Sequence, residues 1–133
     1  MLLLDTNALL WIVLGDARLG RQARELADQA LEDDELWVLA ITFCEVAALV
    51  TFGTLRLTLP MSGWRHDLLG RGLQEQPIDG EIAIRAVELQ GFHKDPADRL
   101  IVATALALDA TLVTSDQKIL DWPGPLARVD ARR

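Results

Sequence analysis

Short apolar runs alternate with longer segments in which apolar residues recur every three or four positions. Runs at 2–4, 36–41 and 111–114 are typical of buried strands, and weaker ones at 75–78 and 126–129 are further strand candidates. The intervening segments have the spacing of amphipathic or buried helices. Strands that alternate with helices indicate a doubly wound sheet. We therefore predict an α/β fold with a central, mainly parallel sheet flanked by helices.

Capping residues set the ends of the predicted helices. We expect helices over residues 8–14, 19–31, 43–52, 62–73, 80–90 and 96–108, and a short one that begins at Ser115 or Asp116. Asp79 and Asp95 precede helical segments as N-caps, with Pro96 at the first helical position. Thr42 and Glu45 have the spacing of a capping box, which predicts that Thr42 begins the third helix.

The composition predicts one ordinary globular domain spanning residues 1–133, since half of its residues are apolar. The single cysteine, Cys44, excludes an internal disulfide, and we expect it to be a small buried residue. No Cys/His cluster indicates structural zinc, and His66 and His93 are expected to be surface or structural residues. The chain has no signal-peptide pattern and no membrane-length apolar run, so we expect a cytoplasmic protein without membrane contact.

The charge balance argues against broad binding along a nucleic-acid backbone. The net charge is −7 at neutral pH, whereas non-specific binding of nucleic acids depends on lysine and arginine. A nucleic-acid substrate would therefore have to be held locally, by a metal ion and a few arginines. The acidic surface is equally consistent with solubility alone or with a basic protein partner.

Four acidic residues stand where an α/β sheet would bring them together. Asp5 and Asp116 follow predicted strands, Glu45 lies in the helix after the second strand, and Asp98 lies in the first turn of the helix that Asp95 caps. Ligands of open parallel sheets bind beyond the carboxyl ends of the strands. Carboxylates that meet there repel one another unless a cation neutralises them. The pattern predicts a site for Mg²⁺ or Mn²⁺ with hard oxygen ligands, suited to phosphate chemistry.

Each of these residues also has a structural alternative. Asp5 and Asp116 could cap the helices that follow, and Glu45 could serve the cap of its own helix. Thr114 and Ser115 could orient a carboxylate or a water molecule, or only cap the short helix. For Arg99, a surface ion pair is the simpler expectation than contact with a carboxylate or phosphate. The four acidic residues considered together favour a metal site.

The segments that carry these residues resemble the motifs of a known family. LLLDTNALLW, ITFCEVAAL, HKDPADRLIVATAL and LVTSDQKI match, in order, the acidic motifs of PIN-domain ribonucleases, and more closely those of VapC-type toxins of bacterial toxin–antitoxin pairs. Asn7 and Thr42 stand where many relatives have histidine and serine. The resemblance covers nearly the whole chain and implies a single PIN-like domain.

The resemblance also implies metal-dependent cleavage of RNA, a homodimer and a cognate antitoxin that blocks the site. In this hypothesis Asp5, Asp98 and Asp116 hold the metal, and Glu45 joins them directly or through water and accepts a proton from the attacking water. We expect the antitoxin to lie over an apolar groove formed by the first helix, with Trp11, and the 43–52 helix. One of its basic residues would enter the carboxylate cluster in place of the metal.

Two other functions remain open at this point. A strand-ending aspartate near the start of the chain is also the nucleophile of haloacid-dehalogenase-like phosphatases. Those enzymes have a second aspartate two residues later, where this chain has Asn7. The other alternative is a non-catalytic acidic module that only binds a protein partner, since a fold alone does not determine function.

Overall fold

Five parallel strands form one sheet, which confirms the predicted α/β architecture. The computed structural model describes all of residues 1–133, and the strands lie in the order β3-β2-β1-β4-β5. They are β1 (Leu2–Leu4), β2 (Leu36–Leu39), β3 (Gln74–Gln76), β4 (Thr111–Thr114) and β5 (Arg128–Asp130). Every neighbouring pair is parallel, so the carboxyl ends of all the strands meet at one edge. The chain adds β2 and β3 on one side of β1 and then β4 and β5 on the other side. Open α/β sheets bind their ligands where the strand order changes in this way.

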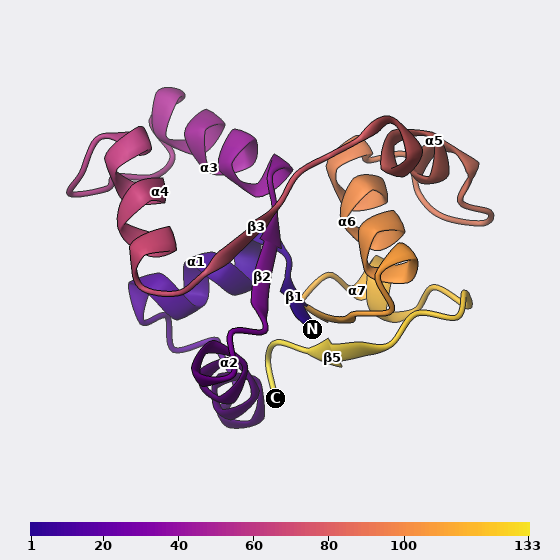
Figure 1. Cartoon of the computed structure of the whole chain (residues 1–133), viewed down its shortest axis with the longest axis horizontal. Coiled ribbons are helices and arrows are strands. Elements are labelled where there is room, and N and C mark those ends of the chain that lie inside the picture. The colour runs from indigo at the N-terminus through magenta and orange to yellow at the C-terminus, as the bar shows by residue number, and fades with distance from the viewer.

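Helices cover both sides of this sheet. They are α1 (Thr6–Leu14), α2 (Arg21–Glu32), α3 (Ile41–Thr51), α4 (Met61–Gly70), α5 (Gly80–Glu88), α6 (Pro96–Ala107) and α7 (Gln117–Leu120). Figure 1 shows α1 to α4 on one side of the strands and α5 to α7 on the other. No helix is both long and apolar enough to cross a lipid bilayer.

The alternation of side chains along β1 divides the core in two. Leu2 and Leu4 face α1 to α4 and belong to a cluster that includes Trp11 and Trp64. Leu3 points to the opposite face, where the second cluster joins it to α6 and α7. A strand that is buried on both faces must be apolar throughout, which is why this run could be predicted from the sequence.

Three local predictions were wrong. Helix α3 begins at Ile41 after Ala40, so Thr42 lies inside the helix and there is no capping box with Glu45. The preceding strand ends correspondingly early, at Leu39 instead of residue 41. Cys44 is exposed rather than buried, because it lies on the solvent side of α3 while Thr42 and Val46 point inward.

The end of the chain packs against the start of α2. The Gly20 N–H donates to the Ala131 carbonyl at 2.8 Å, and the Ala23 N–H donates to the Arg133 carbonyl at 2.9 Å. A Cβ atom at Gly20 would overlap the backbone of Arg133. Residue 20 must therefore lack a side chain if Arg133 is to keep its place beside α2.

We expect Gly20→Ala to destabilise the fold by about 1–3 kcal/mol, because the added methyl group displaces the C-terminal residues. Gly63→Ala is the matched control. Gly63 lies in α4 with no atom near the position of a Cβ, so alanine there should stabilise the helix by about 0.5–1 kcal/mol. Urea denaturation of both variants measures the difference. If Gly20→Ala were as stable as Gly63→Ala, the close contact between Gly20 and Arg133 would contribute nothing to the free energy of unfolding.

Candidate active site

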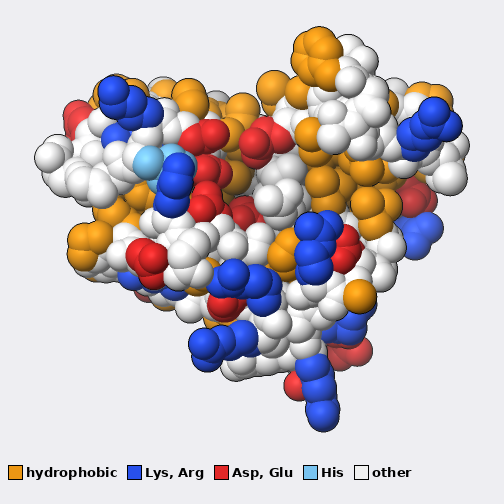
Figure 2. Space-filling model, turned by 180° about the vertical axis from the view of Figure 1, so that it is seen from behind, with side chains coloured by type: hydrophobic (Ala, Val, Ile, Leu, Met, Phe, Trp, Pro, Cys, Tyr) orange, Lys and Arg blue, Asp and Glu red, His pale blue; other side chains and the backbone are white.

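The four acidic residues predicted from the sequence meet in one pocket. Asp5, Glu45, Asp98 and Asp116 line it together with Thr6, Asn7, Ala48 and Leu49. Figure 2 shows acidic side chains gathered in a hollow between the two groups of helices, with a histidine beside them. The pocket lies beyond the carboxyl ends of β1 and β4, where the topology of the sheet places a ligand.

Asp5 is held in place by hydrogen bonds to both of its carboxylate oxygens. The Ala8 N–H donates to Oδ1 at 2.8 Å, so Asp5 does cap α1, and the Thr114 hydroxyl donates to Oδ2 at 2.5 Å. Both Asp5 and Thr114 are buried. Of the two roles considered for Thr114, orienting a carboxylate is the one observed. Asp5 therefore caps α1 and lines the pocket at the same time.

Two threonines position Glu45 from neighbouring helices. The Thr6 hydroxyl of α1 donates to Glu45 Oε1 at 2.5 Å, and its oxygen lies 3.0 Å from the Thr42 hydroxyl of α3. Thr6 has only one hydroxyl proton, which goes to the carboxylate, so Thr42 must be the donor to Thr6. Thr42 thus aims Glu45 at the pocket through Thr6.

Asp116 follows β4 and caps α7. Its Oδ1 accepts from the Lys118 N–H at 2.9 Å, and its own N–H donates to the Thr114 hydroxyl oxygen at 3.0 Å. Thr114 therefore connects the Asp5 carboxylate to the backbone of Asp116, since it also donates to Asp5. Ser115 forms no side-chain hydrogen bond within the chain, and Asn7 is exposed at the pocket wall.

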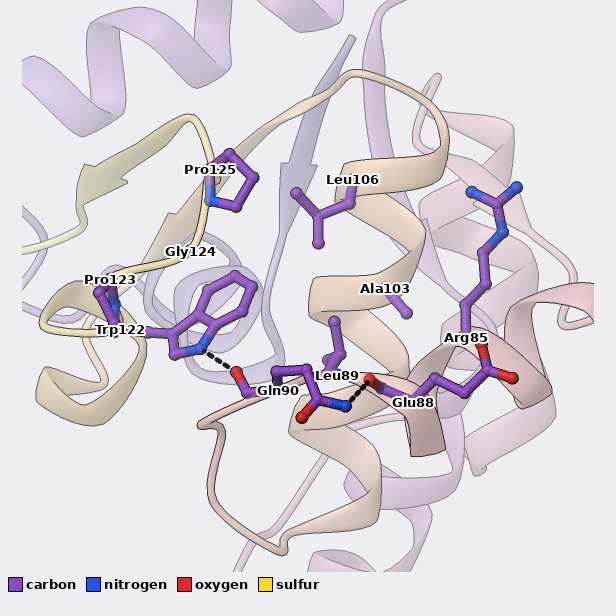
Figure 3. Close-up of a pocket in the computed structure, with 10 residues that line it drawn as sticks. All are labelled: Arg85, Glu88, Leu89, Gln90, Ala103, Leu106, Trp122, Pro123, Gly124 and Pro125. Carbon is purple, nitrogen blue, oxygen red and sulfur yellow. Dashed lines mark hydrogen bonds between the residues drawn. The ribbon is translucent and has the colours of Figure 1, made fainter.

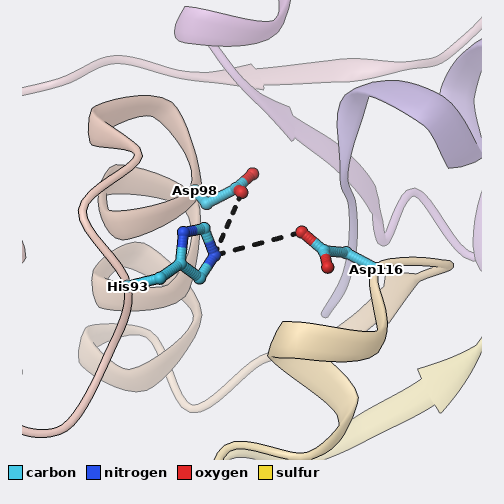
Figure 4. A group of neighbouring side chains, drawn as sticks. All are labelled: His93, Asp98 and Asp116. Atoms are coloured by element: carbon cyan, nitrogen blue, oxygen red, sulfur yellow. Dashed lines mark ion pairs between the residues drawn. The ribbon is translucent and has the colours of Figure 1, made fainter.

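Asp98 enters the pocket from the first turn of α6. Asp95 caps this helix as predicted, accepting from the Asp98 N–H at 3.1 Å, and Pro96 occupies the first turn. The Asp98 side chain does not return this bond. It points instead toward His93, whose Nε2 lies 3.3 Å from Asp98 Oδ2 and 4.0 Å from Asp116 Oδ2 (Figure 4).

His93 was expected to be an ordinary surface or structural histidine, and that prediction missed its position at the pocket. Its Nδ1 accepts from the Asp95 N–H at 3.4 Å, and its ring stacks on Phe92 with centroids 4.4 Å apart. The sequence contained one indication, which is that His93 is the first residue of the segment HKDPADRLIVATAL that carries Asp95 and Asp98. No helical or metal-ligand spacing identifies it, because it lies on the loop before α6.

Arg99 does not form the surface ion pair that was expected. Its guanidinium donates to backbone carbonyls of the last turn of α5 and of the loop that follows, which are those of Ala86, Val87, Leu89, Phe92 and His93. The carbonyls at the end of a helix lack partners within the helix, and a cation there satisfies several of them. Arg99 therefore fixes the loop that carries His93.

Burial and mutual repulsion make two of the carboxyl groups unusually weak acids. Burial raises the pKa of Asp5 from 3.8 to about 6, although its hydrogen bonds from Thr114 and Ala8 act in the opposite direction. Burial likewise raises the pKa of Asp98 from 3.8 to about 7, and the negative charges of Asp95, Asp116 and Glu45 add to this effect. The ionised forms of these two carboxyl groups are therefore less stable in the pocket than they would be in water.

The pocket has the donor set of a divalent-cation site. No lysine or arginine is among its lining residues, so no positive charge of the chain compensates the carboxylates from within the pocket. Carboxylate oxygens are the preferred ligands of Mg²⁺ and Mn²⁺. A bound cation would stabilise the ionised forms of Asp5 and Asp98, whose pKa values burial raises. The residues present therefore fit such an ion.

A second hollow shares no lining residue with the acidic pocket. Trp122 and the Pro123-Gly124-Pro125 turn form one wall, and Leu89 and Leu106 contribute to the rest. The Trp122 indole donates to the Gln90 carbonyl at 3.0 Å (Figure 3). Arg85 and Glu88 are its only charged residues. This hollow contains no group of acidic residues, so we assign the reactive chemistry to the acidic pocket.

The comparisons with known proteins agree with this geometry. The family model of the PIN domain matches residues 2–124, which include all four acidic residues. The chain belongs to the PIN-domain family. The match ends at residue 124, before β5.

Individual relatives extend the comparison. Ribonuclease VapC22 of Mycobacterium tuberculosis is 35% identical over 118 residues, which are 88% of each chain. A toxin–antitoxin complex from Klebsiella pneumoniae contains a chain that is 25% identical, covers 98% of both chains and has a TM-score of 0.66. VapBC2 of Rickettsia felis, solved with a promoter DNA fragment, has a TM-score of 0.72 over 96% of both chains. At 17% identity the last comparison shows the fold of this PIN domain alone.

The raised pKa of Asp98 predicts a pH-dependent stability in metal-free buffer. Below pH 3.8 the Asp98 carboxyl is protonated in both the folded and the unfolded chain, so its raised pKa does not lower the free energy of unfolding. As pH rises toward 7 the unfolded chain ionises first, and the folded protein loses stability. Asp98→Asn removes this loss. Its melting temperature should therefore rise relative to the parent's by several degrees between these pH values.

Differential scanning calorimetry in EDTA measures this difference, and Asp28→Asn serves as the control. Asp28 is exposed on α2, so its substitution should shift the melting temperature by the same small amount at every pH. An Asp98→Asn difference that stays constant or shrinks as pH rises would contradict the destabilised state of Asp98.

Proposed function

We propose that this PIN domain is a metal-dependent endoribonuclease that acts as the toxin of a toxin–antitoxin pair. The observation that carries the proposal is the single pocket in which Asp5, Glu45, Asp98 and Asp116 converge without a compensating cation. A polyanion cannot approach such a pocket unless positive charge is supplied there. The 35% identity to a ribonuclease over 88% of the chain supports RNA as the substrate.

The four acidic side chains have distinct roles in this proposal. Asp5, Asp98 and Asp116 hold Mg²⁺ or Mn²⁺, and Glu45 completes the oxygen set directly or through water. The ion, when bound, supplies positive charge against the phosphate oxygens and makes water more acidic. Glu45 is oriented by the Thr6 hydroxyl and is the carboxylate that takes a proton from the attacking water. Asn7, exposed at the pocket wall, is placed to contact the RNA.

The two alternative functions lose support. The chain matches the PIN domain, and Asn7 stands where a haloacid-dehalogenase-like phosphatase needs its second aspartate. A module that only binds a protein gains nothing from two carboxyl groups with pKa values raised to about 6 and about 7. Such perturbed acids are typical of functional sites.

A cognate antitoxin is the protein partner in this proposal, and the Klebsiella pneumoniae structure is a toxin–antitoxin complex. Trp11 cannot form the partner groove as expected, because it is only 8% exposed and packs in the core. Exposed apolar side chains lie nearby, at the end of α1, at the end of α3 and in the connection to α4. They are Leu14, Phe52 and Leu59, which are 50%, 82% and 44% exposed.

The remaining features of the proposal follow from the family. We infer a homodimer in the cytoplasm, with one acidic pocket in each subunit. The antitoxin would place an arginine or lysine among Asp5, Asp98 and Asp116, where it substitutes for the charge of the metal. This arrangement would keep the nuclease inactive and its carboxylates neutralised in the complex.

We expect Asp5→Asn and Asp98→Asn each to reduce RNA cleavage in Mg²⁺ or Mn²⁺ by at least about a hundredfold, since each removes a ligand charge at almost constant volume. Cleavage of a mixed RNA pool, with and without metal, measures the effect. The exposed Asp28→Asn variant should cleave as the parent does. Full metal-dependent activity in either site variant would remove that residue from the mechanism.

Metal binding should also be visible in the stability of the protein. An ion that binds only the folded chain stabilises it by about 2.7 kcal/mol at a hundred times its dissociation constant. Mg²⁺ or Mn²⁺ should therefore raise the melting temperature of the parent and have much less effect on Asp98→Asn. Equal shifts in the two proteins would place the ion elsewhere.

The partner surface makes a separate prediction. Co-expression with its cognate antitoxin should yield a stable complex that does not cleave RNA. Phe52→Asp should weaken the complex by about 2 kcal/mol or more while leaving cleavage by the free protein unchanged, because Phe52 is exposed and outside the pocket. Size-exclusion chromatography and a cleavage assay measure the two effects. Unaltered binding by Phe52→Asp would exclude this surface.

A further inference from the structure

We propose that His93 is a positioning residue of the acidic pocket, which holds the Asp98 carboxylate through an Nε2–H donor and does not bind the metal itself. This inference rests on the proposed function, because it concerns the same pocket. It assigns a role to a residue that lies in the segment HKDPADRLIVATAL but was expected to be an ordinary surface or structural histidine.

The tautomer of the ring carries the argument. A neutral histidine has one nitrogen that donates and one that accepts. Nδ1 faces the N–H of Asp95 at 3.4 Å and must accept there. The proton of the neutral ring is therefore on Nε2, which points between the carboxylates of Asp98 and Asp116 at 3.3 and 4.0 Å (Figure 4).

Nothing else in the chain satisfies this donor. Nε2 is a buried side-chain nitrogen without a well-aligned hydrogen-bond partner, although the two carboxylates are its nearest acceptors. A buried donor without a partner costs free energy unless a neighbour moves to accept it. A small rotation of Asp98 would give it this partner. The other oxygen of Asp98 would then remain free to bind a cation, as metal-binding carboxylates with a hydrogen-bonded second oxygen do.

Three contacts prevent the ring from turning away. It stacks on Phe92, and Phe92 in turn packs edge-to-face on Trp122 with centroids 5.6 Å apart. The backbone of His93 is fixed by Arg99, whose Nε–H donates to the His93 carbonyl at 2.8 Å. Arg99 and Asp98 are neighbours on α6, so the same helical turn supplies a carboxylate to the pocket and anchors the loop that orients it.

A matched pair of substitutions separates the two nitrogens. His93→Asn keeps an acceptor close to the position of Nδ1, so the Asp95 N–H stays satisfied, but its amide is too short to reach Asp98. His93→Gln places an amide N–H close to the position of Nε2. Isothermal titration calorimetry with MnCl₂ should show affinity about 10–100-fold weaker for His93→Asn and close to the parent's for His93→Gln.

The tautomer can be observed directly in the metal-free parent. Long-range ¹H–¹⁵N NMR spectra, recorded at a pH where His93 is neutral, should show a protonated Nε2 and a bare Nδ1. The opposite tautomer would overturn the proposal, because a bare Nε2 would be a metal ligand. Parental Mn²⁺ affinity in His93→Asn would also overturn it. A parent that binds no Mn²⁺ at this pocket would instead refute the proposed function.

The role of Arg99 is tested in the same assay. Arg99→Lys cannot bond all of the carbonyls that the guanidinium holds, so it should weaken Mn²⁺ binding in the parent. In the His93→Asn background the same substitution should have little further effect, since Arg99 acts through His93. Additive effects of the two substitutions would show that Arg99 does not act through this ring.

Discussion

The arrangement of this pocket is governed by the repulsion between carboxylates that the sheet forces together. Parallel strands end at one edge, so Asp5 after β1 and Asp116 after β4 cannot avoid each other, and α3 and α6 add Glu45 and Asp98. The interior near Asp5 is too poorly solvated to screen these charges, which is why its pKa is raised to about 6. The fold tolerates the repulsion because its two apolar cores stabilise the sheet from both faces.

Hydroxyl groups make the pocket rigid without adding charge. Thr114 connects Asp5 to the backbone of Asp116, and Thr42 acts through Thr6 on Glu45. Neutral donors of this kind fix the direction of a carboxylate but leave its negative charge for a ligand. A lysine or arginine at any of these positions would neutralise the pocket and remove its affinity for a cation. The absence of cationic residues from the lining is thus as informative as the presence of the acidic ones.

The sheet and its acidic residues were predictable because their signals are local. Buried parallel strands such as β1 and β4 are continuous apolar runs, and the residues that follow them must lie at the carboxyl edge. The environment of Glu45 was not predictable, since its partner Thr6 is 39 residues away in the sequence. The capping-box pattern at Thr42 was misleading for the same reason, because a tertiary contact with Thr6 uses its hydroxyl.

The position of His93 at the pocket was missed because this residue lies on the loop before α6, and loops carry no periodicity. The partners of His93 and Arg99 are backbone groups and a carboxylate that come together where the chain turns from α5 to α6, and no residue pattern encodes that geometry. An arginine beside an acidic motif is usually a surface charge. The role of Arg99 depends on the unpaired carbonyls at the end of α5, which the sequence does not place next to it.

The most direct test of this account is a crystal structure grown in MnCl₂ and measured for anomalous scattering. The account predicts a Mn²⁺ peak in contact with oxygens of Asp5, Asp98 and Asp116, with the His93 ring hydrogen-bonded to Asp98 and outside the coordination shell. A Mn²⁺ peak elsewhere, or an acidic pocket that holds no ion at millimolar Mn²⁺, would contradict it.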